Sequence, residues 1–348
     1  MKIGVLTFCN ANNYGAALQA FALQKKLEQM GHAAELVDYR CTAIEATHAK
    51  KTVTSSGISL KKRIYNFLYN VVFSSRGQKF EAFRKRVKRS KCYQKSDLFS
   101  EQKRYDLFIA GSDQVFNFAL TGHDETFFLD FVDQKDKKVA YAASMGSFID
   151  AEKETYAKLL KDFRLLSVRE KSTALQIENK LGIACEVVPD PVFLYSAEQW
   201  KEIIGLRVNP KNKPYVLIYT LFESPELYRL AKEYAKQNHC EVIAITKSLR
   251  PGGKADTFVR DAGPQEFLEF IMNAKYVVTD SFHGTAFSLI FGKQLKIVMP
   301  PKAQNRIIDL LSELGIEQDF TEVDYEQVQK KLASYRETGI QFLDKINN

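Results

Sequence analysis

The sequence predicts an α/β fold with two doubly wound, Rossmann-like domains that face each other across a cleft. First, strand-like runs alternate with helix-like runs twice along the chain, which is typical of parallel sheets covered by helices. Second, 348 residues exceed what one hydrophobic core usually supports. Third, "TDSFHGTAFSLIFGK" (279–293) joins a buried strand, a polar turn and a buried helix, the unit that builds such domains. We expect an N-terminal domain at 1–195 and a C-terminal domain at 196–348.

The first domain is expected to consist of strands that end in polar loops and lead into helices. Its expected segments are a strand at 2–8, a polar loop at 9–17, a helix at 18–31, a strand at 33–39, strand-to-loop units at 105–117 and 137–147, a strand-to-helix unit at 163–177 and a closing segment at 186–194. A basic, helical insertion at about 41–104 interrupts this series.

The second domain repeats the pattern. Its expected segments are a strand at 213–222, a helix at 224–239, a strand at 241–248, a helix at 263–274, a strand at 274–280, a helix at 285–292, a strand at 294–301 and a helical tail from 305 to about 345. Pro225 behind Ser224 is a usual helix opening, and Gly292 is a usual helix end.

The insertion carries most of the positive charge. Between Lys50 and Arg104 there are 16 Lys and Arg residues and three acidic ones, a net charge of +13, whereas the whole chain carries +8. Cations mixed with bulky apolar residues suit peripheral contact with an anionic membrane surface or a polyanionic substrate. They equally suit a solvated helical face whose apolar side packs on the core. No nucleic-acid module accompanies the patch, so we expect no nucleic-acid partner.

The five cysteines are scattered, without a C-x-x-C pair, as reduced thiols in a cytoplasm would be. No apolar run approaches the roughly 20 residues that span a bilayer, and the start of the chain has the pattern of a strand rather than of a signal peptide. We therefore expect a cytoplasmic protein, at most peripheral at the inner face of the membrane.

His283 is the foremost candidate for a functional residue. It lies in the turn "DSFHG", at the carboxyl end of an expected strand, where open parallel sheets bind ligands. The start of the following helix offers free N–H groups and the positive end of its dipole to an anion. Gly284 allows close backbone approach, and Ser281 and Thr285 add hydroxyl donors. The alternative is a simple N-cap beside a surface histidine.

Other strand ends carry further candidates, each with a purely structural alternative. Arg169 ends a buried strand and needs either a ligand or an ion pair with Glu170 or another acid. Two polar loops suit the recognition of sugar hydroxyls, although each could be an ordinary turn. Their candidate residues are Ser112, Asp113, Gln114 and Asn117 in one loop and Asn13, Tyr14 and Gly15 in the other. Lys302 and Arg306 follow the strand next to the histidine turn and could reach the same anion.

Several expected signatures are missing: G-x-G-x-x-G, G-x-x-x-x-G-K-[ST], G-x-S-x-G and H-E-x-x-H. No D-x-D pair is present to hold a nucleotide-bound metal. These absences weaken the dehydrogenase, P-loop, α/β-hydrolase and zinc-protease interpretations. We expect an anion held without a metal or resident cofactor, next to a surface that reads hydroxyl groups.

Six segments in this order resemble the polysaccharide pyruvyl transferase family over about residues 1–315. They are "NANNYGAALQAFALQKKLEQMGHAAELVDY", "FIAGSDQVFN", "YAASMGS", "LLSVREKS", "VPDPVFL…W" and "DSFHGTAFSLIFGKQ". The resemblance implies a GT-B-like fold and the transfer of a pyruvyl group from phosphoenolpyruvate onto two hydroxyls of one sugar, which yields a cyclic ketal and phosphate. It also implies sugars of bacterial capsule, exopolysaccharide or wall polymers, including lipid-linked precursors.

The resemblance assigns roles to particular residues. The family's histidine falls on His283, its donor-gripping arginine on Arg169, and a further basic group on Lys302 or Arg306. Some relatives have an arginine–leucine pair where this chain has Ser281 and Phe282. We expect His283 to transfer a proton, as acid or as base, with Asp113 as its partner on the acceptor side.

Two other classes of function stay open at the level of sequence. One is a GT-B glycosyltransferase that uses a nucleotide sugar. The other is a non-catalytic protein that binds a polysaccharide or a membrane surface through residues 50–104.

Overall fold

The computed structural model describes residues 1–48, 59–208, 213–301, 304–317 and 323–347. The first domain has a six-stranded parallel sheet in the order β2-β1-β3-β4-β5-β6. Its strands are β1 (Lys2–Leu6), β2 (Ala33–Leu36), β3 (Leu107–Ala110), β4 (Lys138–Ala143), β5 (Leu165–Val168) and β6 (Glu186–Val187). The central strands β1, β3 and β4 are almost completely buried, as expected for a parallel sheet with helices on both faces.

Helices link these strands and form the insertion. They are α1 (Tyr14–Gln29), α2 (Thr42–His48), α3 (Leu60–Val72), α4 (Ser74–Arg84), α5 (Lys95–Glu101), α6 (Phe118–Thr121), α7 (Lys153–Leu160) and α8 (Lys171–Leu181). Most of the described part of the basic insertion is therefore helical, but residues 85–94 between α4 and α5 are not, and Arg89 and Tyr93 form isolated bridges with Leu36 and Tyr39. The loop predicted at 9–17 is too long, because α1 begins four residues earlier than predicted. The Asn13 side chain accepts hydrogen bonds from the amides of Gly15 and Ala16 and so caps the helix there.

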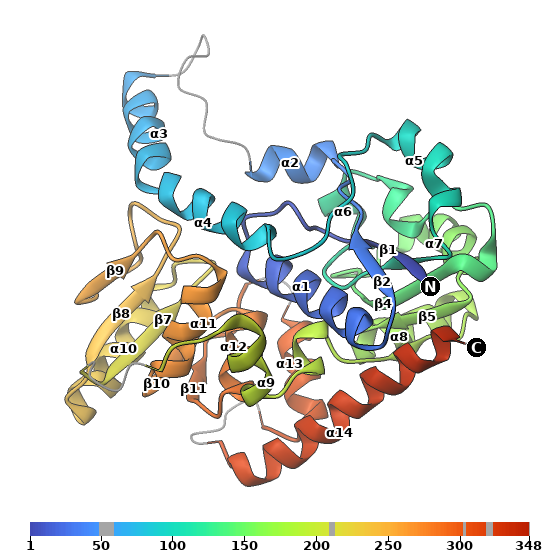
Figure 1. The fold of residues 1–348 in the computed structure, drawn as a ribbon. Helices are drawn as coiled ribbons and strands as arrows, with labels where there is room; N and C mark the ends of the chain where they lie inside the picture. Colours follow the sequence, from blue (N-terminus) through green and yellow to red (C-terminus); the bar gives the residue numbers. More distant parts are fainter. Residues whose placement is uncertain (49–58, 209–212, 302–303, 318–322, 348) are drawn as a thin grey trace.

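The second domain has a five-stranded parallel sheet in the order β11-β10-β7-β8-β9. Its strands are β7 (Tyr215–Tyr219), β8 (Glu241–Ile245), β9 (Thr257–Val259), β10 (Tyr276–Thr279) and β11 (Gln294–Ile297). Its helices are α9 (Ala197–Ile204), α10 (Pro225–Asn238), α11 (Pro264–Asn273), α12 (Phe282–Ile290), α13 (Asn305–Glu313) and α14 (Tyr325–Asp344). β9, a short strand at the sheet edge, was not predicted from the sequence. The predicted pair of doubly wound α/β domains is confirmed (Figure 1).

The last helix returns to the first domain. α14 starts beside the second sheet and runs along the molecule to the end of the first sheet (Figure 1). The ring of Phe342 lies 5.9 Å from that of Tyr141 on β4, and Arg164 donates a hydrogen bond to the Ile346 carbonyl at 3.1 Å. The C-terminal segment, predicted as part of the second domain, therefore packs on both domains. No helix in the described ranges has both the length and the apolarity to cross a membrane.

The order of the strands locates the point in each sheet where ligands are expected. The chain winds outward from β1 and β3 in the first sheet, and from β7 and β10 in the second. At such a switch point the loops behind the two central strands diverge and leave a crevice at the carboxyl edge. The two domains meet at these edges. Tyr14 of α1 stacks on Phe267 of α11 at 4.3 Å and donates a hydrogen bond to the Ala262 carbonyl at 2.8 Å.

Candidate functional site

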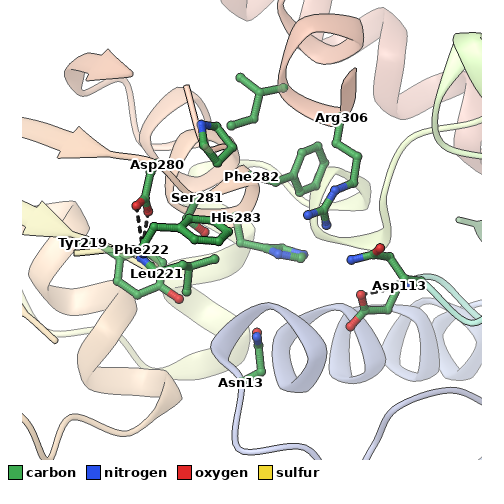
Figure 2. A pocket seen from close by; sticks show the side chains of 13 residues that line it. Asn13, Asp113, Tyr219, Leu221, Phe222, Asp280, Ser281, Phe282, His283 and Arg306 are labelled. Carbon is green, nitrogen blue, oxygen red and sulfur yellow. Dashed lines mark hydrogen bonds between the residues drawn. The ribbon is translucent and has the colours of Figure 1, made fainter. Parts of the chain in front are cut away.

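A pocket of about 140 Å³ lies between the two switch points (Figure 2). The loops behind β1, β3, β7, β10 and β11 form it together with the start of α13. Its lining residues are Asn13, Asp113, Gln114, Tyr219, Leu221, Phe222, Asp280, Ser281, Phe282, His283, Pro300, Arg306 and Ile307. Both domains thus contribute to one site, as the strand topology requires.

His283 projects from the first turn of α12 toward the first domain (Figure 2). Ser281 caps this helix by accepting a hydrogen bond from the Gly284 amide. The His283 imidazole lies directly on Gly15 of α1. A Cβ placed on Gly15 would be 2.0 Å from His283 Nδ1 and 2.3 Å from Cε1. Gly15 was predicted to bind the acceptor, but it contacts the His283 ring instead. Any larger residue at this position would occupy the space of the ring.

A buried ion cluster lies behind the imidazole. His283 Nε2 is 3.6 Å from Asp190 Oδ2, an ion-pair separation rather than a hydrogen bond. The same Asp190 oxygen accepts hydrogen bonds from Arg169 Nη1 at 2.7 Å and from Ser112 Oγ at 3.0 Å. Arg169 Nε donates to Glu170 at 2.9 Å. Arg169 is thus held by two acids and does not line the pocket, which is the structural alternative that the sequence left open.

The cluster fixes the charge of its members. Burial alone would raise the pKa of the Asp190 carboxyl, but contact with His283 and the charge of Arg169 together lower it well below its usual range. Burial likewise opposes the charge of Arg169, but Glu170 and Asp190 raise its pKa. Asp190 and Arg169 are therefore both charged, and the Asp190 carboxylate places a negative charge 3.6 Å from the His283 ring.

The first turn of α12 differs from the expected donor site. Gly284 does not face a ligand, because a Cβ there would lie 2.4 Å from Thr279 Oγ1 and 3.0 Å from the Tyr219 ring. Its role is to let α12 approach the sheet. Thr285 is completely buried and does not line the pocket. The Gly284 amide donates a hydrogen bond to Ser281 Oγ, and the Thr285 amide donates one to the Ser281 carbonyl. The amides of Phe282 and His283 are therefore the ones in this turn that could donate to a ligand.

The predicted acceptor residues of the first domain divide into two groups. Asn13, Asp113 and Gln114 line the pocket. Asp113 has a φ of +81°, an uncommon conformation for a residue other than glycine, and its carboxylate accepts a hydrogen bond from the Gln114 amide. Asn117 lies outside the pocket and orients Gln114 through a hydrogen bond of 2.9 Å.

Two further predicted acceptor residues, Tyr14 and Ser112, are buried outside the pocket. Tyr14 is completely buried in the domain contact described above, so its hydroxyl is not available to a sugar. Ser112 is also completely buried, and its hydroxyl donates to Asp190. Both positions were predicted from their place in polar loops, and both side chains turn inward because the protein itself satisfies their hydroxyls.

The second predicted donor cation does face the pocket. The guanidinium of Arg306, from α13, points toward His283 and the Asp113 loop (Figure 2). Its Nε is buried and has no hydrogen-bond partner among the described residues. Burial and the charge of Arg169 lower the pKa of Arg306, so an anion bound in the pocket would stabilise its charged form. Lys302 lies outside the described residues.

Two acidic residues of the site, Asp190 and Asp280, were not predicted from the sequence. Asp190 lies between apolar neighbours in "VVPDPVF", and a carboxylate in so buried a stretch should have indicated a partner. Its Oδ1 caps the 3₁₀ turn η5 (Pro191–Leu194), which Trp200 holds through a hydrogen bond to the Val192 carbonyl at 2.9 Å. Asp280 lines the pocket and accepts hydrogen bonds from the amides of the loop behind β7, which fixes that wall.

Comparison with known proteins agrees with this architecture. The profile of the polysaccharide pyruvyl transferase family matches residues 13–295. No curated protein matches the sequence. Among solved structures, a putative UDP-N-acetylglucosamine 2-epimerase from Listeria monocytogenes is similar with a TM-score of 0.51 and 10% identity, over 98% of this chain and 90% of that one. The MnaA–UDP co-structure from S. aureus is similar with a TM-score of 0.52 and 11% identity, over 97% and 91%.

At these sequence identities, similarity to the two structures supports the fold alone. The predicted GT-B-like arrangement of two domains is confirmed. The family match covers more than half of the chain, including the histidine turn, the "VPDPVFL" segment and the loop that caps α1. This chain is a transferase that belongs to the polysaccharide pyruvyl transferase family.

Proposed function

We propose that the protein transfers a pyruvyl group from phosphoenolpyruvate onto two hydroxyls of one sugar, forming a cyclic ketal and releasing phosphate. The observation that carries the proposal is the convergence of His283, Arg306 and the free amides of α12 on one pocket. Phosphoenolpyruvate is small and bears a carboxylate and a phosphate, which an arginine and helix amides bind without a metal. No resident cofactor is needed for this chemistry.

In this mechanism His283 acts as the general acid. In its protonated form, His283 gives a proton to C3 of the donor, so that C2 becomes electrophilic. One sugar hydroxyl attacks C2 and loses its proton to Asp113, which lines the pocket. The second hydroxyl then attacks C2 and gives its proton to the now neutral His283 imidazole, while the bond between C2 and the phosphate oxygen breaks and phosphate leaves. Arg306 and the α12 amides stabilise the charge that collects on the departing phosphate.

Arg169 acts indirectly in this scheme. Because Glu170 and Asp190 hold its guanidinium, it keeps Asp190 ionised and so maintains the negative charge beside the His283 ring. This role differs from the direct grip on the donor that the resemblance implies. An Arg169→Lys variant should therefore change the pH profile of turnover more than the KM for the donor.

The proposal is tested by offering phosphoenolpyruvate together with a panel of galactosides, glucosides and mannosides and following phosphate release. His283→Ala should lower turnover roughly 10²–10⁴-fold. The matched control is His239→Asn, which changes an exposed histidine at the end of α10. Near-native turnover of the His283 variant would remove it from the mechanism.

A nucleotide-sugar glycosyltransferase is the second candidate, favoured by the similarity of the fold to the UDP-bound S. aureus structure. The two candidates predict opposite outcomes in thermal unfolding. Stabilisation by phosphoenolpyruvate but not by nucleoside diphosphate sugars supports pyruvyl transfer, and the reverse supports glycosyl transfer.

We also propose that α3 contacts an anionic membrane surface. Its apolar side chains Leu60, Ile64, Phe67, Leu68 and Val71 are 48–71% exposed on a helix that projects from the body (Figure 1). Lys61 and Lys62 lie on the same helix. Such a combination binds membranes that contain anionic lipid.

Co-sedimentation tests this contact. Wild-type protein should bind vesicles of phosphatidylglycerol and phosphatidylcholine better than vesicles of phosphatidylcholine alone. Phe67→Glu with Leu68→Glu should abolish the binding. Leu175→Glu, which changes a 49% exposed leucine on α8, is the matched control and should leave it intact. Equal binding by both variants would refute the contact.

A further inference from the structure

The helix that carries the pocket cation Arg306 is bound to the first domain by a hydrogen-bonded pair that the mechanism above does not use. Asp309 lies three residues after Arg306 on α13, and its Oδ2 accepts two hydrogen bonds from Ser172 of α8. One comes from the Ser172 amide at 3.1 Å and the other from the Ser172 hydroxyl at 2.7 Å. Residues three apart are neighbours on one side of a helix. The contact with the first domain and the pocket guanidinium therefore lie close together on α13.

Ser172 lies at a helix start that has no cap of its own. The N-cap residue Glu170 makes no side-chain capping bond to α8, and its carboxylate accepts a hydrogen bond from Arg169 at 2.9 Å instead. The first amides of a helix need acceptors from outside the helix, and Asp309 supplies one from the second domain. The negative charge of Asp309 also lies at the positive end of the α8 dipole, which is a favourable place for it. The cap of α8 is thus also a contact between the domains.

The pair determines how α13 lies relative to the first domain. Ile307, Leu310 and Leu311 are buried, and α13 packs against α12 of its own domain and against α8 of the other. Within the described residues, Asp309 forms no ion pair, and the side chain of Arg306 forms no hydrogen bond that would hold the guanidinium in place. The position of the guanidinium in the pocket therefore depends on the position of its helix.

One short segment of the first domain contacts the supports of both charged groups that the second domain places in the pocket. Arg169, at the end of β5, holds Asp190, which lies 3.6 Å from His283. Ser172, three residues further on, holds the helix of Arg306. Residues 169–172 thus relate the imidazole and the guanidinium, which face each other in the pocket (Figure 2).

We propose that Ser172 and Asp309 are positioning residues, which set the place of Arg306 in the pocket and thereby the affinity for the donor anion. Neither residue lines the pocket, so each acts through α13 and not by contact with a ligand. Identifying the anion as phosphoenolpyruvate rests on the proposed function, whereas the effect on Arg306 does not.

Titration with phosphoenolpyruvate in a calorimeter tests the pair without turnover. Arg306→Met should weaken phosphoenolpyruvate binding about 10-fold or more, the factor expected for one charge-assisted contact. Ser172→Ala and Asp309→Ala displace the guanidinium but do not remove it, so each should weaken binding by a part of this factor, about 3-fold. The variant with both replacements should bind no more weakly than the weaker single variant, because both break the same contact.

A double-mutant cycle with Arg306 separates positioning from a merely structural role. In an Arg306→Met background, Ser172→Ala should leave the affinity for phosphoenolpyruvate unchanged, because no guanidinium is left to misplace. An equal loss of affinity in both backgrounds would overturn the proposal. The conservative variants Ser172→Thr and Asp309→Asn keep the hydroxyl donor and an oxygen acceptor, so both should keep most of the affinity.

Asp324→Ala is the matched control. Asp324 is an exposed aspartate that caps α14 by accepting hydrogen bonds from the amides of Glu326 and Gln327, and it does not line the pocket. Its replacement removes a helix-capping carboxylate, as Asp309→Ala does, and should lower the melting temperature by a similar amount. The affinity for phosphoenolpyruvate should stay at the wild-type value.

Nuclear magnetic resonance of the ligand-free protein, with ¹⁵N-labelled arginine, reads the position of the guanidinium directly. The Nε–H signal of Arg306, identified by its loss in Arg306→Met, should shift in Ser172→Ala and in Asp309→Ala but not in Asp324→Ala. An unshifted signal in the first two variants would overturn the proposal. If phosphoenolpyruvate does not bind the wild-type protein, the proposed function fails, and this signal alone decides whether Ser172 and Asp309 position Arg306.

Discussion

Replacing Gly15 with alanine provides the sharpest test of the site, because one methyl group from the first domain would displace the histidine of the second. The added Cβ would lie 2.0 Å from His283 Nδ1, and contact becomes ordinary only at about 3.4 Å, so the imidazole must retreat by about 1.4 Å. Behind the ring, Asp190 is only 3.6 Å away. The ring therefore cannot simply slide back and must leave its place between Asp190 and the pocket.

The expected loss can be estimated from this displacement. A misplacement of about 1 Å can cost roughly 10²-fold in rate, so kcat/KM for phosphate release should fall by about that factor. Overpacking costs about 1–3 kcal/mol, while the higher helix propensity of alanine returns up to about 1 kcal/mol. The net stability change in urea unfolding should therefore be small relative to the kinetic loss.

Gly77→Ala is the matched control. Gly77 also lies in a helix, α4, and a Cβ there meets nothing within 4 Å. This variant should be as active as wild type and slightly more stable. Nuclear magnetic resonance of ¹⁵N-labelled imidazoles provides a direct readout, since the His283 signals should shift in Gly15→Ala only. If Gly15→Ala has native turnover and unchanged imidazole signals, the ring does not lie on Gly15 and the reasoning fails.

Three other substitutions test separate parts of the site. Asp190→Asn leaves Arg169 with a buried, incompletely paired charge and should destabilise the protein by about 3–5 kcal/mol. Because folding lowers the pKa of Asp190, the stability difference between wild type and Asp190→Asn should be constant above about pH 5 and should shrink as acid protonates the wild-type carboxyl. A stability difference that grows in acid would contradict the ion cluster. Asp113→Asn keeps the amide contact and the tolerance of a positive φ, so stability should change by at most about 0.5 kcal/mol. Its turnover should fall about 10²-fold if the carboxylate accepts a proton, and unchanged turnover would exclude that role. Gly284→Ala should cost about 1–3 kcal/mol in urea unfolding through its clash with β10; native stability would show that α12 has room to move.

The sequence predicts the elements and the strand ends well, because these depend on local patterns. The β10–α12 turn with His283 is an example, since a buried strand, a capping serine and an apolar helix lie within fifteen residues. Partners that come from distant segments leave no such pattern. Asp190 lies 93 residues before His283, and only the folded loops bring the two side chains to 3.6 Å. For the same reason, the choice between ligand and ion pair for Arg169 could not be made from the sequence.

The sequence also does not show which side chains of a polar loop are buried and which face the pocket. Ser112 and Asp113 are neighbours with similar hydrogen-bonding ability, yet one is completely buried and the other lines the pocket. The positive φ of Asp113 turns the chain at this point, and that backbone choice follows from the contact with β4, where Ser144 donates to the Asp113 carbonyl. Tyr14 is a similar case, because its ring reaches α11 of the other domain.

The chemistry of the site depends on how the domains pack. The second domain supplies His283, whereas the first supplies the glycine on which the ring lies and the carboxylate 3.6 Å behind it. Tyr14, adjacent to Gly15, ties the same helix to the second domain through the Phe267 stack and the Ala262 carbonyl. Any movement between the domains must therefore change both the contact of His283 with Gly15 and the contacts of Tyr14 with the second domain. The packing of the two domains is therefore what holds the ring between Gly15 and Asp190 at the pocket.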